Sequence, residues 1–369
     1  MESDASSNPY KIRRATGSSA GQQPARRSGG CGWIFLCLIL TGLLGLTWLG
    51  ILGTAGAGIA MSGAKNQGFW EEFVVEESSS EDRVAIIEVA GLISNLAVDP
   101  SGMTMVDSIK EQLALIADDD SIKGVLLKID SPGGEVLASD DIYRELQSFQ
   151  EVTGKPIVAS MSGLAASGGY YVAAPCHWIV ANELTITGSI GVILHSYNYR
   201  GLMDKVGIQP QVYKSGRFKD MLSGEKAPNE VLPEAKAMVQ DMIDETFDRF
   251  KEVVQEGRAY SLAQNNGESK SLVDDWEDYA DGRILSGKQA FELGFVDELG
   301  NFDKAITRMG MLIDRSEFDL VEYKLPFSFG NLFRLLGQAS KARIELDLGI
   351  ALPRLQAGRL YFLAANYIQ

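Results

Sequence analysis

Two kinds of apolar pattern divide the chain. One is continuous: residues 33–60 (WIFLCLILTGLLGLTWLGILGTAGAGIA) are apolar or small, and no charge occurs between Ser28 and Ala64. About twenty apolar residues are enough to cross a bilayer, so this stretch predicts a transmembrane helix. The other begins at residue 83, where short β-branched runs alternate with segments of helical spacing.

The alternation after residue 83 predicts an α/β domain built from parallel crossover units. We expect strands at residues 83–89, 124–130, 156–161, 178–181, 187–193 and 211–214, and helices at 104–117, 138–150, 199–206 and 233–256. Another helix is expected to start near Ser167, and residues 284–299 predict a helix and a closing strand. No internal repeat is visible, so the chain holds one copy of the domain.

The remaining segments are assigned by composition. Residues 1–32 are rich in Ser, Gly, Pro, Gln and Arg and predict a disordered tail. Residues 61–82 include an acidic, Ser-rich stretch and predict a linker before a domain at 83–310. Residues 311–369 form an extension whose apolar runs are too interrupted to span a bilayer. This extension is interpreted as an oligomer or membrane contact, or as an addition to the core.

The apolar stretch has two interpretations. Small residues at 54–57 would suit cleavage of a signal peptide, but the run is longer than the roughly 7–15 residues of a signal-peptide core. We therefore favour an uncleaved anchor. Five basic residues precede it and only Lys65 follows soon after, which predicts a cytoplasmic N-terminus with the acidic bulk across the membrane.

The charge excludes some partners. The net charge is -15, and the residues after 65 carry 28 basic and 47 acidic side chains. Such a surface repels phosphate backbones, so no nucleic-acid partner is expected. Cys176 is the one cysteine outside the N-terminal part, which excludes a disulfide framework. Two histidines without a cysteine cluster argue against a zinc site, and we predict neither metal nor cofactor.

Ser167 is the candidate nucleophile. It lies in residues 164–174 (LAASGGYYVAA), which predict a tight turn followed by a helix. A hydroxyl at a helix N-terminus faces unpaired backbone N–H groups and the positive end of the helix dipole, both of which favour developing negative charge. The alternative is a helix cap followed by glycines that allow close packing.

The residue that would act as the base for Ser167 has more than one candidate. His177 lies ten residues further on, about 15 Å along a continuous helix, and His195 lies at the far end of a predicted strand. Either can be a structural histidine. A lysine can serve only when neutral, which requires burial or nearby positive potential. Lys219 follows a glycine-containing turn that could point it inward, although a solvated lysine is the ordinary alternative.

Four motifs occur in order: residues 130–134 (DSPGG), 166–171 (ASGGYY), 187–191 (TGSIG) and 214–220 (KSGRFKD). In order and spacing they resemble those of the SppA signal peptide peptidases, over roughly residues 83–305. These are membrane-anchored serine proteases with a Ser-Lys dyad. The resemblance implies a ClpP/crotonase-like α/β fold with a repeated ββα unit, preceded here by the transmembrane helix.

The resemblance also implies roles for individual residues. Ser167 would be the nucleophile, Lys219 the general base, and Ser189 the serine that positions the lysine. Gly133 and Gly134 match the oxyanion-hole segment, where backbone N–H groups approach the intermediate because no Cβ intervenes. From its place directly after the nucleophile, we infer that Gly168 is a further donor.

The chain is similar to the short form of the family, whose members assemble into rings in which the lysine of one subunit completes the site of its neighbour. A homo-oligomer with composite sites is therefore expected. We expect it in the inner membrane, where it would degrade cleaved signal peptides or other membrane-associated peptides on the extracytoplasmic side. A crotonase-like acyl-thioester enzyme is an alternative, against which the membrane helix, the acidic surface and the Ser-Lys pair argue. A catalytically silent membrane scaffold is another, and the intact Ser167, Ser189 and Lys219 argue against it.

Overall fold

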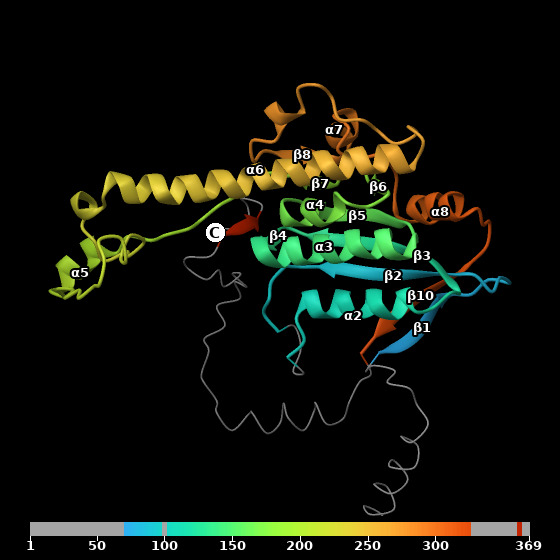
Figure 1. The fold of residues 1–369 in the computed structure, drawn as a ribbon, viewed down its shortest axis with the longest axis horizontal. Coiled ribbons are helices and arrows are strands. Elements are labelled where there is room, and N and C mark those ends of the chain that lie inside the picture. The colour runs from blue at the N-terminus through green and yellow to red at the C-terminus, as the bar shows by residue number, and fades with distance from the viewer. Residues whose placement is uncertain (1–69, 98–101, 326–359, 364–369) are drawn as a thin grey trace, which may run out of the picture. The chain divides into compact units, whose positions relative to one another are not determined.

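The computed structural model describes residues 70–97, 102–325 and 360–363, which form a mixed sheet with helices packed on both faces (Figure 1). The predicted disordered tail and membrane helix lie outside these residues, as do residues 61–69 of the predicted linker. Within the described ranges, no helix combines the length and the apolar character needed to cross a membrane.

The elements follow one another in an alternating order. The strands are β1 (Glu71–Glu76), β2 (Arg83–Ala90), β3 (Ile122–Ser131), β4 (Gly133–Glu135), β5 (Ile157–Ala165), β6 (Trp178–Ala181), β7 (Ile186–Gly188), β8 (Ile284–Ser286), β9 (Glu298–Leu299), β10 (Asp319–Lys324) and β11 (Tyr361–Leu363). The helices are α2 (Met105–Ala117), α3 (Val136–Thr153), α4 (Gly168–Ala173), α5 (Arg200–Val206), α6 (Pro233–Gln264), α7 (Gly287–Glu292) and α8 (Phe302–Ile313), with short 3-10 turns η1 (Pro228–Glu230) and η2 (Trp276–Tyr279).

The main sheet runs in the order β1-β10-β2-β3-β5-β6-β9, and every neighbouring pair from β10 to β9 is parallel. β1 is antiparallel to β10 at the edge, and β7 pairs with β5 and β8. β4 and β11 form a separate two-stranded sheet. The predicted α/β class with parallel crossover units is thereby confirmed.

The central strands are buried on both faces because successive side chains point to opposite sides of a strand. Ile87, Leu127 and Ala159 belong to the core formed with α2, α3, α4 and α6, whereas their chain neighbours Ile86, Leu126 and Val158 pack with α8. These near-continuous apolar runs are the reason that the strands could be recognised from sequence.

The predicted domain boundaries were too narrow. Residues 71–76 were assigned to the linker, but they form β1, and residues 319–324 of the predicted extension form β10 beside β2. The expected strand at 211–214 is not formed, because this exposed segment has no partner strand among the described residues. Of the expected strand at 187–193, only the short β7 is formed. Whether each of these segments forms a strand depends on a partner strand that lies far away in the sequence.

Helix α6 carries a projecting segment. Its 32 residues extend over about 48 Å, and its buried side chains, which include Phe250, Val253 and Val254, lie mostly in the second half. The other end supports residues 196–232, called the arm below, which contains α5 and extends past the sheet (Figure 1). A hydrogen bond from Tyr199 N to Gly224 O (2.9 Å) joins the two sides of the arm.

The position of α6 depends on Gly257, and Gly257→Ala tests this. A Cβ there would lie 2.1 Å from Ala174 O, a backbone atom at the end of α4. We expect the variant to lose about 1–3 kcal/mol of unfolding free energy, measured by denaturant titration, because overpacking forces the helices apart. Gly201→Ala in α5, with no atom within 4 Å of the new Cβ, is the matched control. Equal unfolding free energies for the Gly257→Ala and Gly201→Ala variants would contradict this packing.

Candidate active site

Ser167 lies at the junction of β5 and α4 in a strained conformation. Its φ is 54° and its ψ -117°, in a region that non-glycine residues rarely adopt, at a cost on the order of 1–3 kcal/mol. The residue is fully buried, and its Oγ has no hydrogen-bond partner within the described ranges. Strained backbone and an unsatisfied buried hydroxyl are each expected at functional sites.

The strain is maintained by backbone contacts on both sides of the serine. Ser167 N donates to Gly188 O at 2.8 Å, and Ala166 N donates to Ser131 O at 3.1 Å. A Cβ on Gly168 would lie 2.6 Å from Ser139 Oγ. The glycine at 168 therefore lets the start of α4 lie directly against Ser139 in the first turn of α3.

The three predicted oxyanion-hole glycines are brought together. A Cβ on Gly168 would lie 3.1 Å from both Gly133 Cα and Gly134 N. Gly133 has a φ of +98°, and its N–H donates to Ser131 Oγ at 3.1 Å. Gly168 is the first residue of α4, where backbone N–H groups have no acceptor within the helix. Because Gly168 directly follows Ser167, the three glycines lie next to the candidate nucleophile.

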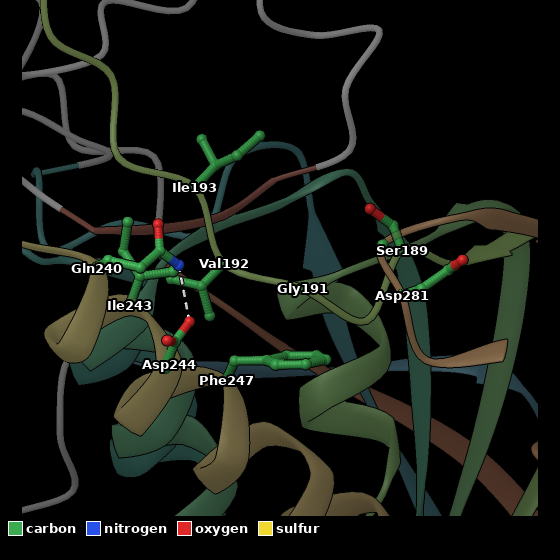
Figure 2. A pocket seen from close by; sticks show the side chains of 10 residues that line it. Ser189, Gly191, Val192, Ile193, Gln240, Ile243, Asp244, Phe247 and Asp281 are labelled. Carbon is green, nitrogen blue, oxygen red and sulfur yellow. Dashed lines mark hydrogen bonds between the residues drawn. The ribbon is translucent and has the colours of Figure 1, made fainter. Parts of the chain in front are cut away.

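Ser189 directly follows Gly188, the residue that accepts the bond from Ser167 N. It too has a positive φ, 51°, and its N–H donates to Arg283 O at 2.7 Å. Ser189 lines a cavity of about 490 Å³ between residues 191–193 and α6. Figure 2 shows Ser189 and Asp281 on one side, with Gln240 and Asp244 of α6 on the other.

Lys219 is not brought to Ser167 within this chain. It lies on the arm and is exposed, whereas the Ser167 hydroxyl is buried and has no hydrogen-bond partner among the described residues. The neighbouring cations are paired: Lys214 and Lys226 contact Asp220 at 2.9 and 3.0 Å, and Arg217 contacts Glu234 at 2.9 Å. These contacts, above all the hydrogen bond from Lys214, lower the pKa of Asp220 to about 2. Among the described residues, the Lys219 ammonium has no ion pair.

Neither histidine is bonded to Ser167. His177 is buried, its Nδ1 lies 2.7 Å from Gln150 Oε1, and its carbonyl accepts from Ser261 Oγ. Burial lowers the pKa of His177 to about 4. His195 Nε2 is buried without a partner in the described part of the chain. His177 is thus a packed structural residue.

A further part of the site was missed from sequence. β11, inside the predicted extension, pairs antiparallel with β4, so that Phe362 faces Gly134. Residues 361–363 are too short a run for any strand pattern to single them out. Their position next to the glycines became evident only from the fold.

Comparison with known proteins places the chain in a family. Residues 150–314 match peptidase family S49, and residues 96–177 match the Clp protease family. A provisionally named protease of Synechocystis is 37% identical over 275 residues, which are 73% of this chain and 89% of that protein. The chain belongs to peptidase family S49.

Other relatives of this S49 peptidase carry the SppA name. A provisionally named signal peptide peptidase SppA of Enterococcus faecium is 34% identical over 69% of this chain and 70% of its own length. The chloroplastic serine protease SPPA of Arabidopsis thaliana is 32% identical over 62% of this chain and 32% of its own length. The protein is therefore a serine protease of the SppA type with a ClpP-like α/β domain.

The buried His177 predicts an acid-sensitive fold. Its pKa falls from 6.5 to about 4 on folding, so the unfolded chain binds the extra proton between these values and stability decreases as pH decreases. Between pH 7.5 and 5, the native chain should lose about 2 kcal/mol more unfolding free energy than His177→Gln. Denaturant titrations of both proteins at the two pH values measure this difference, and parallel losses would contradict it.

Proposed function

We propose that this S49 peptidase is a membrane-anchored endopeptidase in which Ser167 and Lys219 form the catalytic dyad. Its substrates are cleaved signal peptides or other membrane-associated peptides. The observation that carries the proposal is Ser167 itself: a strained, buried serine next to three closely packed glycines, whose hydroxyl has no hydrogen-bond partner in the described part of the chain.

The chemistry follows from these positions. The neutral Lys219 amine takes the proton of Ser167 as Oγ attacks the peptide carbonyl. Backbone N–H groups of Gly168 and of the Gly133-Gly134 segment stabilise the oxyanion. The lysine then gives its proton to the leaving amine, and water hydrolyses the acyl-enzyme by the same steps. Ser189 Oγ accepts a hydrogen bond from the lysine and so positions it.

The contacts of the arm favour Lys219 over Lys214 as the base. Lys214 Nζ lies 2.9 Å from both carboxylate oxygens of Asp220, so this lysine is already held in an ion pair. Lys219 has no such partner among the described residues and is free to enter another site.

The exposed base and the buried nucleophile support a composite site between two copies of the chain. The arm carries many exposed apolar side chains, a composition typical of subunit interfaces; they include Tyr197, Leu202, Val206, Ile208, Val212 and Tyr213. In the proposed homo-oligomer, the cavity beside Ser189 is the opening through which Lys219 of a neighbouring copy reaches Ser167.

The proposed location rests on sequence. Residues 33–60 would anchor the chain in the inner membrane, with a cytoplasmic N-terminus and the protease domain on the extracytoplasmic side. A site close to the membrane surface suits extended, largely apolar peptides.

Substitution of the base tests the dyad directly. Lys219→Met and Ser167→Ala should each lower kcat/KM for an unfolded apolar peptide by at least about a thousandfold, since neither partner acts alone. Lys214→Met is the matched control on the same turn and should stay within a few-fold of the native chain. Full activity of Lys219→Met would contradict the dyad and direct attention to His195.

Mixing inactive subunits tests the composite site. When Ser167→Ala and Lys219→Ala chains are coexpressed, about a quarter of the sites in a randomly assembled ring combine an intact serine with an intact lysine from its neighbour. Peptidase activity should therefore return to about a quarter of the native value. If both residues of a site came from one chain, the mixture would stay inactive.

A further inference from the structure

Ser189 is held in place by a turn from a distant part of the chain. β7, which ends directly before Ser189, pairs antiparallel with β8, so that Gly188 lies opposite Ile284. Where this pairing ends, Ser189 N donates to the carbonyl of Arg283, the residue before β8, at 2.7 Å. The positive φ of Ser189 (51°) is therefore maintained by the position of the Arg283 carbonyl.

The Asp281 carboxylate holds the residue that carries this carbonyl. Asp281 Oδ1 accepts hydrogen bonds from Arg283 N at 3.1 Å and from Arg283 Nε at 2.7 Å, and Oδ2 accepts from Nη2 at 2.6 Å. An aspartate bonded to the backbone N–H two residues further on closes a turn. The side-chain hydrogen bond from Arg283 is the largest cause that lowers the pKa of Asp281 to about 2, so the carboxylate is ionised at neutral pH.

The same turn packs closely against the backbone that follows Ser189. A Cβ on Gly191 would lie 3.2 Å from Gly282 Cα, and Gly282 itself has a φ of +88°. Asp281, Gly282 and Ser189 line one cavity, and Figure 2 shows Asp281 and Ser189 on the same wall of it. In the proposed composite site, this is the cavity that Lys219 of a neighbouring copy enters.

The contacts of Asp281 decide between two ways in which it could serve the site. A direct ion pair with the entering lysine would favour the charged amine, which cannot act as a base. Both oxygens of Asp281 are already bonded to Arg283. Across the cavity, Asp244 of α6 accepts a hydrogen bond from Gln240 Nε2 at 2.7 Å and does not contact the turn. These contacts favour a role of Asp281 that passes through Ser189.

We propose that Asp281 is a positioning residue: it holds the turn whose carbonyl fixes Ser189, and Ser189 in turn orients Lys219 of the neighbouring copy toward Ser167. The inference rests on the proposed function, because Ser189 matters to the reaction only if Lys219 is the base. A misplacement of a catalytic group by about 1 Å can cost about 100-fold in rate. The loss is expected in kcat, since the base acts in the chemical step.

Substitutions of Asp281 in the full-length protein test this role with an unfolded apolar peptide as substrate. Asp281→Ala removes both bonds to Arg283 and should lower kcat by about 10- to 100-fold, with KM within about twofold of the native value. Asp281→Asn retains an oxygen that can accept from Arg283 N, and its kcat should stay within a few-fold of native. Native kcat in Asp281→Ala would overturn the inference.

A double variant shows whether Asp281 acts through Ser189. Ser189→Ala alone removes the hydroxyl that the turn positions. If the two residues act as one unit, Asp281→Ala combined with Ser189→Ala should be no slower than Ser189→Ala alone, because effects within one unit are not additive. Two losses in kcat that multiply would overturn the proposed route and show that Asp281 acts independently of Ser189.

Asp119→Ala is the matched control for general destabilisation. Asp119 Oδ1 accepts from Ser121 N at 2.9 Å, which is the same kind of contact two residues on, and Asp119 pairs with Arg83. This turn directly precedes β3, whereas the site lies beyond the other end of that strand. The control should lose unfolding free energy but keep its kcat. A kcat as low as that of Asp281→Ala would reduce the role of Asp281 to stability and overturn the inference.

Failure of the inference and failure of the proposed function give different results. If the native chain cleaves the peptide, Lys219→Met does not, and Asp281→Ala cleaves as fast as native, the inference alone is wrong. If the native chain cleaves no peptide, or if Lys219→Met is fully active, the proposed function is wrong and the inference falls with it.

Discussion

The site depends on one constraint: backbone must contact backbone where the β3–β4 turn meets the start of α4. A Cβ on Gly133 would lie 2.0 Å from Phe362 O, and a Cβ on Gly134 would lie 1.8 Å from Ile93 O. No other residue type fits at these positions without moving the main chain. Gly168, which lies against both glycines, directly follows the strained Ser167, and β4 is the edge along which β11 pairs. The candidate nucleophile and the proposed oxyanion-hole glycines are therefore parts of one backbone arrangement.

The sheet and α6 hold this arrangement rigid. β3 and β5 are packed on both faces, so the turns at their carboxyl ends, where the site lies, are fixed by the core. The buried ion pair between Arg258 of α6 and Asp297 connects the helix to the sheet. Asp297 also accepts a hydrogen bond from Ile179 N in β6 at 2.8 Å. Desolvating two charges is costly, and these additional bonds offset part of that cost. Because the arm is carried by α6, its position depends on this connection too.

The parts predicted from sequence are those fixed by local pattern. β2, β3, β5 and β6 are short apolar runs, and Trp178–Ala181 was predicted with its observed bounds. Ser167 was noticed because glycines follow it. The edge pair of β1 and β10 was missed, because its partners lie about 250 residues apart and neither segment has a strong strand pattern alone. The aromatic cluster of Tyr171, Phe250 and Phe362 was missed for the same reason, since α4, α6 and β11 each supply one ring. Sequence order also gives no distance between Ser167 and Lys219.

The separation of Ser167 and Lys219 explains how the proposed dyad could depend on assembly. Within the described residues, the buried Ser167 hydroxyl has no base beside it, while the candidate base is exposed on the arm. A lysine in water is charged at neutral pH and cannot accept a proton, and removal of water is one of the conditions that favours the neutral amine. In the proposed oligomer, one event would bring the amine to Ser167 and cover the apolar arm. Placement of the base and its activation would then occur together, so that peptide hydrolysis would depend on assembly rather than on folding of a single chain.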